Sequence, residues 1–449
     1  MKISIIGTGY VGLVTGVCLA TKGQQVICID VLPDRVAGIN LGESPFYEPG
    51  LSELLQQRVA DGSLRAATNL TAAVADSDII MIAVGTPDRD GAIDLSDVKA
   101  AAREIGDALR TNKAYKVVTL KSTVVPGTTD TMVRQAVESA SGKRAGEFGM
   151  CMNPEFLREG NAIEDFMEPD RIIIGQWDEA SGQALAAVYR GFDCPLILTT
   201  LRNAEMIKYA SNALLATLIS FSNELASLCE ATPGMDIEMV MDGLHLDKRL
   251  SPLVAGERVQ PGILTYLRAG CGYGGSCLPK DVTALRAYAR EAKIPTPLLD
   301  AVASINTRRP QQLAALVEKA LGTLSGASLA VFGLTFKAGT DDLRSSPALA
   351  VIDQLLIKGA SVRAYDPLIL TDRPPSLDPR VTLNENPEAA LTGADAALLV
   401  TSWPEFATYD WQALSAKMRR PVIIDGRNAL RQIEWDRNVT YLPIGRMPQ

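Results

Sequence analysis

The sequence predicts an α/β fold in which two Rossmann-like, doubly wound domains are joined by a helical middle with one long helix. Short apolar stretches alternate with helical segments at both ends of the 449-residue chain, a rhythm typical of mostly parallel sheets covered on both faces. Between them, residues 202–232 contain no glycine or proline and repeat apolar residues at helical spacing. We therefore expect three domains, at residues 1–200, 201–308 and 309–449.

In the first domain, six apolar stretches predict strands, and helical spacing between them, as at 97–110, predicts the crossover helices. The expected strands are KISIIG (2–7), QVICID (25–30), DIIMIAV (78–84), KVVTLKST (116–123), FGMCMNPEF (148–156) and RIIIG (171–175).

The helical middle begins with the long segment 202–232. A helix that is apolar over most of its surface must be buried between domains or against a second subunit, so we expect a homodimer. Residues 282–307 are also helical in pattern, although Pro295 and Pro297 interrupt them.

In the third domain the strand pattern returns with GASLAVFGLTFK, GASVRAYDP, ADAALLVTSW and PVIIDGRN, the last strand expected. Both α/β parts carry a glycine turn after one strand and an aspartate, Asp30 or Asp366, at the end of another. This shared pattern indicates an internal repeat of a nucleotide-binding unit.

Composition limits the kinds of partner. Hydrophobic residues make up 47% and charged residues 21%, which is typical of a globular protein. The net charge of -8 implies no basic face, so we expect no nucleic-acid partner. No apolar run approaches the about 20 residues that span a bilayer, so we expect no membrane association.

The seven cysteines and single histidine exclude a Cys/His zinc site, and we expect no metal. No CxxC pair is present, and the chain begins with MKISIIG rather than with a signal-peptide pattern. A reduced, cytoplasmic protein is the simplest interpretation.

The motif GTGYVG follows the first expected strand and precedes a helical segment. Its first two glycines permit a tight turn near a pyrophosphate, and its third permits helix–strand packing. A carboxylate at Asp30 accepts from ribose hydroxyls and repels a 2′-phosphate, which favours NAD over NADP. A Rossmann-like domain without a dinucleotide is the alternative. The expected NAD contacts are Gly7, Gly9, Tyr10, Val11, Gly12 and Asp30.

Several polar residues near other expected strand ends have two interpretations each. Arg35 either contacts adenine or phosphate, or is a solvated charge. Thr86, Ser122 and Thr123 offer hydroxyls to the ligand crevice at the carboxyl ends of parallel strands, or are turn residues.

The segment NPEFLREG places Glu155, Arg158 and Glu159 at a strand-to-helix boundary. The two carboxylates either form a solvated helix start or position a water or a substrate hydroxyl. Within the long helix, Lys208 and Asn212 lie four residues apart and share a face. A buried lysine needs an anionic partner, which is either a structural carboxylate or a reacting oxyanion.

The stretch CGYGGSCLPKD places Cys277 in a glycine-rich turn just before an expected helix. A thiol near a helix N-terminus and lysines has a lowered pKa and is a better nucleophile. Inert core is the alternative for a buried cysteine. Cys271 is expected to be a spectator, because its position needs only a small residue. A disulfide between the two is a further alternative.

Three cations follow strands of the third domain: Lys337 and Arg344 in FKAGTDDLR, and Arg427 in DGRN. Cations on loops at one sheet edge suit a diphosphate, although solvated charges need no such explanation.

With these motifs in hand, the chain resembles the UDP-glucose/GDP-mannose dehydrogenase family along essentially its full length. The matching motifs, in order, are GTGYVG, VGTP, KSTVVPGT, NPEFLREG, AEMIKYASNA, GYGGSCLPKD, FKAGTDDLR and DGRN. The resemblance implies a four-electron oxidation at C6 of a nucleotide sugar, with two NAD used in turn.

The resemblance also implies residue roles. Cys277 is the nucleophile that forms a thiohemiacetal and then a thioester, and Lys208 and Asn212 stabilise the oxyanion. Asp281, with Thr123 and Glu155 through water, handles protons. Implied NAD contacts are Thr86, Thr123, Glu159, Arg344 and Arg35. Implied substrate contacts are Glu155, Phe156, Leu157, Arg158, Lys208, Asn212, Tyr266, Leu267, Arg268, Gly274, Lys337 and Arg427.

The motifs resemble the UDP-glucose branch more than the GDP-mannose branch, which remains the alternative. The segment LHLDKRLSPLVAGERVQPGILTYL is longer than the family's usual link to the substrate loop. Because of this extra length, two residues, Arg249 and Arg258, are candidates for the place of the family's inter-subunit arginine.

Overall fold

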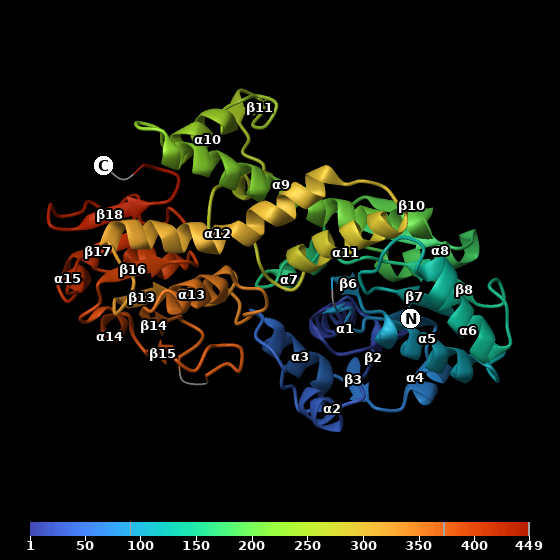
Figure 1. Ribbon diagram of the computed structural model, residues 1–449. Helices are drawn as coiled ribbons and strands as arrows, with labels where there is room; N and C mark the ends of the chain where they lie inside the picture. Colours follow the sequence, from blue (N-terminus) through green and yellow to red (C-terminus); the bar gives the residue numbers. More distant parts are fainter. Residues whose placement is uncertain (90, 371–372, 448–449) are drawn as a thin grey trace. The chain divides into compact units, whose positions relative to one another are not determined.

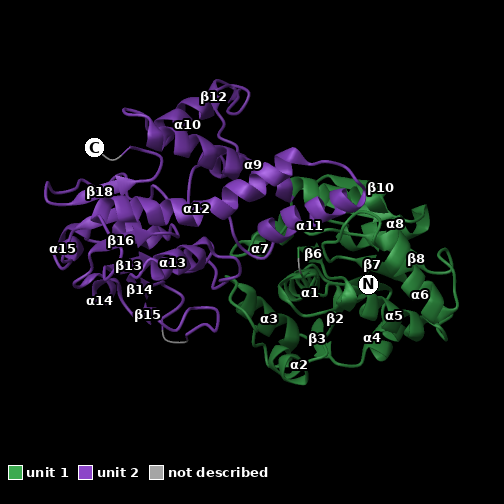
Figure 2. Cartoon of the chain, viewed as in Figure 1, with its two compact units in different colours: residues 1–211 green, residues 212–449 purple. Residues whose placement is uncertain are grey.

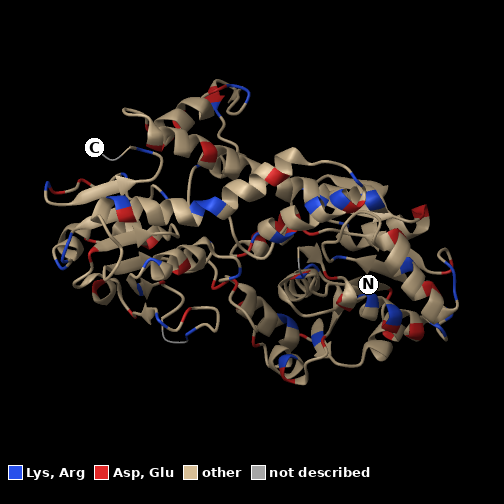
Figure 3. Cartoon of the chain, in the orientation of Figure 1, with Lys and Arg blue, Asp and Glu red and all other residues tan. Residues whose placement is uncertain are grey.

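The computed structural model describes residues 1–89, 91–370 and 373–447, which form two compact units (Figures 1 and 2). Unit 1 comprises residues 1–211 and unit 2 residues 212–449. Acidic and basic residues alternate along the elements of each unit (Figure 3).

Unit 1 contains an eight-stranded sheet in the order β10-β9-β8-β7-β4-β1-β2-β3. All neighbouring strands are parallel except β8 and β9, which are antiparallel. The strands are β1 Lys2–Ile6, β2 Gln25–Ile29, β3 Leu64–Ala67, β4 Ile79–Ile82, β7 Val117–Leu120, β8 Gly149–Met152, β9 Ile172–Gln176 and β10 Leu196–Thr200, and a separate ribbon pairs β5 Asp88–Arg89 with β6 Ala92–Ile93.

Helices cover both faces of this sheet. Successive residues of β4 alternate between two apolar clusters: Ile79 and Met81 join one, and Ile80 and Ile82 join the other. Both faces of β4 are therefore buried, as its unbroken apolar run predicts. The helices are α1 Tyr10–Thr21, α2 Pro33–Asn40, α3 Leu51–Ala60, α4 Leu70–Asp76, α5 Ser96–Leu109, α6 Arg134–Ser141, α7 Ala162–Met167 and α8 Glu179–Ala186, with short helical turns η1 Thr129–Val133 and η2 Ala187–Tyr189.

The long helix α9, Leu201–Ala231, begins in unit 1 and continues into unit 2. The prolines at 295 and 297 separate two further helices, since α11 ends at Glu291 and α12 begins at Pro297. Helix α12 continues to Leu321, through the expected domain boundary at 308, with Pro310 inside it. No helix within the described ranges is both long and apolar enough to cross a bilayer.

Unit 2 contains a six-stranded parallel sheet in the order β15-β14-β13-β16-β17-β18. The expectation that PVIIDGRN contains the last strand was wrong, because β18 follows it and extends the sheet. The strands are β13 Ser328–Phe332, β14 Ser361–Tyr365, β15 Thr382–Leu383, β16 Ala396–Leu399, β17 Val422–Asp425 and β18 Thr440–Pro443, with a hairpin of β11 Leu253–Val254 and β12 Glu257–Arg258.

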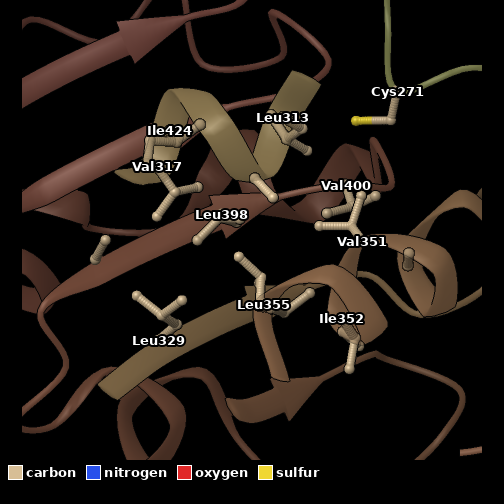
Figure 4. Packing of buried hydrophobic residues seen from close by; sticks show 14 of the residues in the cluster. Cys271, Leu313, Val317, Leu329, Val351, Ile352, Leu355, Leu398, Val400 and Ile424 are labelled. Atoms are coloured by element: carbon tan, nitrogen blue, oxygen red, sulfur yellow. The ribbon is translucent and has the colours of Figure 1, made fainter. Parts of the chain in front are cut away.

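Helices α12 and α13 pack on this sheet through one large apolar cluster (Figure 4). Leu329, Leu398 and Ile424 extend from the strands toward Val317 of α12 and Leu355 of α13. The helices that follow α9 are α10 Ile237–His245, α11 Leu278–Glu291, α12 Pro297–Leu321, α13 Pro347–Ile357, α14 Pro387–Leu391 and α15 Trp411–Ser415, with turns η3 Gly262–Tyr266 and η4 Pro404–Thr408.

The two sheets repeat one local arrangement, as the sequence predicts. In unit 1 the Asp30 carboxylate accepts from the backbone N–H and hydroxyl of Thr8, in the turn after β1. In unit 2 the Asp366 carboxylate accepts from the same two groups of Thr335, in the turn after β13. The mixed α/β architecture with parallel sheets and a helical middle is therefore confirmed.

Candidate active site

The GTGYVG turn connects β1 to α1 and leaves no room for side chains at two of its glycines. Gly7 has φ +97°, and a Cβ there would lie 2.8 Å from the carbonyl oxygen of Ala83. A Cβ on Gly12 would lie 1.9 Å from the carbonyl oxygen of Gly7. At Gly9, by contrast, no atom lies within 4 Å of that position, so a pyrophosphate can approach the backbone.

Asp30 follows β2, the strand next to β1, and lies within hydrogen-bonding distance of the turn. Its Oδ2 accepts from the Thr8 N–H at 3.0 Å, and its Oδ1 accepts from the Leu32 N–H at 3.1 Å. Burial raises the pKa of this carboxyl, but hydrogen bonds from Thr8 and Leu32 outweigh it and the pKa is lowered. Asp30 is therefore an ionised acceptor, as a ribose hydroxyl requires. The residues fit NAD.

Arg35 lies beside this carboxylate rather than apart from it. Its Nη1 is 3.5 Å from Asp30 Oδ2, and its side chain is partly exposed. The contact places a cation next to the expected ribose position and leaves both interpretations of Arg35 open.

The carboxyl ends of β4 and β7 hold the expected hydroxyl residues. Thr86 Oγ1 donates to the carbonyl oxygen of Thr123 at 3.0 Å, and Ser122 Oγ donates to that of Val84 at 2.6 Å. Both hydroxyls thus stabilise the turns that follow adjacent strands, as the turn interpretation predicts.

A buried charge cluster lies beyond the ends of β7 and β8. Lys208 Nζ is 2.9 Å from Glu155 Oε1, and both side chains are about 95% buried. Lys121 Nζ donates to Asn153 Oδ1 at 3.0 Å. The anionic partner expected for Lys208 is therefore Glu155, a carboxylate that was itself a candidate for proton handling.

The protonation of this cluster follows from its contacts. Burial raises the pKa of Glu155, but the charge of Lys208 and the hydrogen bonds from Lys208 and Leu157 outweigh it, so the pKa is lowered. Burial lowers the pKa of Lys121 to about 8. Lys121 was not among the residues predicted from the sequence, which were its neighbours Ser122 and Thr123. A lysine directly after an apolar strand was the available signal.

The rest of the NPEFLREG loop is anchored by its own contacts. Glu155 Oε2 accepts from the Leu157 N–H at 2.6 Å, and Arg158 forms a bidentate ion pair with Asp165.

The Phe156 ring is flanked by two cations. Its centroid lies 4.0 Å from the guanidinium of Arg171 and 5.4 Å from Lys208 Nζ. Glu155 and Glu159 are both buried, so the interpretation of these two carboxylates as a solvated helix start was wrong. Arg158, between them, is exposed.

In unit 2, Cys277 directly precedes α11, whose first residue is Leu278. Its thiol is partly buried and lies 3.5 Å from the hydroxyl of Ser276. Cys277 is the N-cap residue of this helix. The prediction of a cysteine at a helix N-terminus is confirmed.

Asp281 lies one helical turn after Cys277 and is almost fully buried. Its Oδ2 accepts from Asn212 Nδ2 at 2.6 Å, and its Oδ1 pairs with Lys280 Nζ at 2.5 Å. Unit 2 thus brings together Cys277, Asp281 and Asn212, residues that the sequence places in two separate motifs.

The glycines before Cys277 permit close packing against the loop that contains Lys337 and Arg344. A Cβ on Gly274 would lie 2.3 Å from the carbonyl oxygen of Ser345, and one on Gly275 would lie 2.8 Å from the Phe336 ring. The Gly275 N–H also donates to the carbonyl oxygen of Arg344 at 2.9 Å. The two motifs are therefore neighbours in space.

The three loop cations differ in their contacts. Arg344 pairs with Asp342 at 2.8 Å and is exposed, whereas Lys337 Nζ lies 6.0 Å from the Phe336 ring centroid. Arg427 Nε donates to the carbonyl oxygen of Val400 and its Nη1 to that of Gly272. Arg427 thus lies against the segment that leads to Cys277.

The expected substrate loop, Tyr266 to Arg268, is held by α10. Arg268 pairs with Glu238 at 2.8 Å and with Asp242 at 2.7 Å. The carbonyl oxygen of Leu267 lies 3.1 Å from Nε2 of His245. Glu238 also contacts Asn428 and Arg431, so it is a polar centre that no sequence motif indicated.

Cys271 belongs to the apolar cluster of unit 2 (Figure 4). Its thiol donates to the carbonyl oxygen of Gly426 at 3.1 Å, and burial raises its pKa. Cys271 is therefore a core residue.

Comparison with protein families gives three consecutive matches. Residues 1–193 match the NAD binding domain of the UDP-glucose/GDP-mannose dehydrogenase family. Residues 202–308 match its central domain, and residues 330–432 match its UDP binding domain.

Individual relatives match over nearly the whole chain. A UDP-glucose 6-dehydrogenase of Bacillus subtilis is 41% identical over 95% of this chain and 89% of its own length. A GDP-mannose 6-dehydrogenase of Pseudomonas putida is 39% identical over 93% of this chain and 94% of its own. Among solved structures, a UDP-glucose dehydrogenase of Pyrobaculum islandicum matches with TM-score 0.87 and 37% identity, covering 99% of this chain and 98% of that one.

Proposed function

Because the chain belongs to the UDP-glucose/GDP-mannose dehydrogenase family, we propose that it oxidises UDP-glucose at C6 to UDP-glucuronate, with two NAD reduced per sugar. It is an NAD-dependent nucleotide-sugar dehydrogenase, and NAD is its cofactor. UDP-glucose as the sugar and the route through a covalent intermediate are the proposal. The observation that carries it is the thiol of Cys277 at the N-terminus of α11, with Asp281 one turn away.

The overall reaction balances in atoms and electrons. One sugar, two NAD⁺ and one water give one uronate, two NADH and three protons. NAD⁺ is consumed as a co-substrate and accepts a hydride from C6 in each of the two oxidations. The water supplies the second carboxylate oxygen.

Cys277 divides the oxidation into two easier steps. Its thiolate adds to the C6 aldehyde that the first oxidation produces, forming a carbon–sulfur bond and a thiohemiacetal. Loss of hydride and of the hydroxyl proton converts this adduct to a thioester. Water then attacks the thioester carbon, the carbon–sulfur bond breaks, and the thiolate is regenerated.

The buried polar pairs supply donors and acceptors for these steps. Lys208 and Asn212 lie four residues apart on α9 and would donate to the developing oxyanion. Glu155, which accepts from Lys208, and Asp281, which accepts from Asn212, would take up protons, with Thr123 assisting through water. Each proposed donor is thus already hydrogen-bonded to a proposed base.

The remaining contacts follow the family motifs. NAD would contact the GTGYVG turn, Asp30, Arg35, Thr86, Thr123, Glu159 and Arg344. The nucleotide sugar would contact residues 155–158, Lys208, Asn212, Tyr266, Leu267, Arg268, Gly274, Lys337 and Arg427. The hydrogen bond from Arg427 to Gly272 supports this assignment, because it puts a cation beside the thiol loop.

GDP-mannose is the second candidate substrate, since a GDP-mannose 6-dehydrogenase is 39% identical to this chain. The two substrates differ in the nucleobase and in the configuration at C2 of the sugar, and the sequence favours UDP-glucose only through the resemblance of its motifs to that branch.

The deciding measurement is NADH released per mole of limiting UDP-glucose, with GDP-mannose in parallel. We expect two NADH with UDP-glucose and none with GDP-mannose. The variant Cys277→Ala should bind NADH normally yet form no uronate, whereas Cys271→Ala should retain turnover, because Cys271 is a core residue. Uronate formation by Cys277→Ala would remove the thioester route, and activity with GDP-mannose alone would overturn the substrate.

We also propose that the chain acts as a homodimer in the cytoplasm, where a thiol nucleophile stays reduced. Leu214, Phe221 and Leu228 recur every seven residues along α9 and are 51%, 45% and 57% exposed. Such a stripe suits a second copy of the same helix. Both candidate inter-subunit arginines are exposed and bonded within their own chain: Arg258 donates to carbonyls of its hairpin region, and Arg249 pairs with Asp247.

A further inference from the structure

Glu48 is a buried carboxylate in the loop between α2 and α3, outside every motif that the family resemblance uses. Only 5% of its surface is exposed. Its oxygens accept three short hydrogen bonds from segments that are far apart in the sequence. Burying a carboxylate is costly unless hydrogen bonds replace its water, so three such bonds mark an organised site.

The three donors come from two functional segments of unit 1. Glu48 Oε2 accepts from the Tyr10 hydroxyl at 2.5 Å and from the Gly160 N–H at 2.6 Å. Its Oε1 accepts from the Ala162 N–H at 2.7 Å. Tyr10 is the first residue of α1 in the GTGYVG turn, and Gly160 ends the NPEFLREG loop.

Local structure explains why the second segment needs an external acceptor. Asn161 is the N-cap residue of α7, but its side chain makes no capping hydrogen bond. Gly160 has φ +81°, a turn conformation that presents its N–H to the same carboxylate. Glu48 therefore takes the place of a capping side chain for this turn.

Packing aligns Glu48 with Tyr10 as well. The Tyr10 ring lies 5.1 Å from the ring of Phe46, two residues before Glu48. The loop between α2 and α3 thus contacts Tyr10 through both an aromatic pair and a hydrogen bond.

We propose that Glu48 is a positioning residue for NAD: its carboxylate ties Tyr10 in the dinucleotide turn to the backbone that follows Glu159. These bonds set the separation between two segments that both contact the dinucleotide. The inference rests on the NAD contacts assigned to Tyr10 and Glu159 in the proposed function. It requires neither the thioester route nor a particular sugar.

The variants Glu48→Gln and Tyr10→Phe test this role with little change in shape. An amide has one acceptor oxygen and adds donors, so Glu48→Gln places N–H groups against N–H or O–H groups. Tyr10→Phe removes one donor and keeps the ring. Titration calorimetry should show the NADH Kd raised about tenfold in Glu48→Gln and about threefold in Tyr10→Phe, the losses typical of one or two hydrogen bonds.

Three further readouts separate positioning from stability. The double variant should bind NADH about as weakly as Glu48→Gln alone, because the Tyr10 hydroxyl acts through its bond to Glu48, which Glu48→Gln already disrupts. Hydrogen exchange at the Gly160 and Ala162 amides should quicken in Glu48→Gln. The control is Asp178→Ala, which removes the side-chain cap of α8 and should lower Tm without changing the NADH Kd.

An unchanged NADH Kd in both variants, whatever their Tm, would overturn the proposal. So would an equal rise of the NADH Kd in Asp178→Ala, since any loss of stability would then produce it. Tyr10→Phe keeps the test decisive if Glu48→Gln does not fold. The NADH titration contains no sugar. Its result therefore does not depend on whether the thioester route or UDP-glucose as substrate is correct.

Discussion

Lys121 is the buried charge of unit 1 from which we expect the clearest effect of pH on the stability of the fold. It is almost fully buried, donates to Asn153, and has Glu155 and Lys208 as charged neighbours. Burial lowers its pKa to about 8, whereas an unfolded lysine has a pKa of about 10.4. Between these values the unfolded chain binds the proton more tightly, so this group makes stability rise with pH.

The prediction at this scale is the pH dependence of Lys121→Met. The wild type should gain stability relative to the variant as pH rises from 8 to 10, by at most about 3 kcal/mol, because the cost of a buried ammonium disappears. Urea unfolding of both proteins at pH 7, 8, 9 and 10 measures this difference. If the free energies of unfolding of the two proteins changed in parallel with pH, folding would not lower the pKa of Lys121.

Single residues also show where sequence interpretation is sufficient. Lys208 was expected to meet an anion, because a lysine in an apolar helix needs one. The structure identifies that anion as Glu155, a residue 53 positions away in the numbering. The need is a local property of the helix, but the partner depends on which strand end the helix packs against.

Among the elements, α9 joins the two units of the chain and carries the exposed stripe of Leu214, Phe221 and Leu228. Its helical character follows from 31 residues without glycine or proline. Its exposed apolar face is the feature that the proposed dimer would bury.

The prediction at this scale is that Phe221→Glu dissociates the dimer. A charge at the centre of the stripe would be buried without a partner, which is strongly unfavourable. Sedimentation should show a shift from dimer to monomer by at least tenfold in Kd. Leu298→Glu, on an exposed site of α12, is the control and should remain dimeric. A dimeric Phe221→Glu would remove α9 from the interface.

At the scale of the whole molecule, the chain contains two Rossmann-like sheets in two compact units. The Gly7–Gly12 turn and Asp30 lie in unit 1, and Arg427 and the loop of Lys337 lie in unit 2. The two ligands should therefore protect different parts of the chain from hydrogen exchange.

We expect NADH to slow exchange around residues 7–12 and 30–35, and UDP to slow exchange around residues 333–338 and 425–428. Gly12→Ala should abolish the first effect, since its Cβ would lie 1.9 Å from the Gly7 carbonyl oxygen, and should keep the second. Hydrogen-exchange mass spectrometry measures both. Protection of residues 425–428 by NADH alone would contradict the division.

The sequence by itself determined the α/β class, the long helix and the order of the motifs. These features are local: apolar periodicity, glycine turns and helix starts are properties of short segments. The tertiary structure alone decided the pairings of Glu48 with Gly160, Lys121 with Asn153, and Asn212 with Asp281. Each of these joins segments that become neighbours only when strands and helices pack, and no local pattern in either segment specifies its partner.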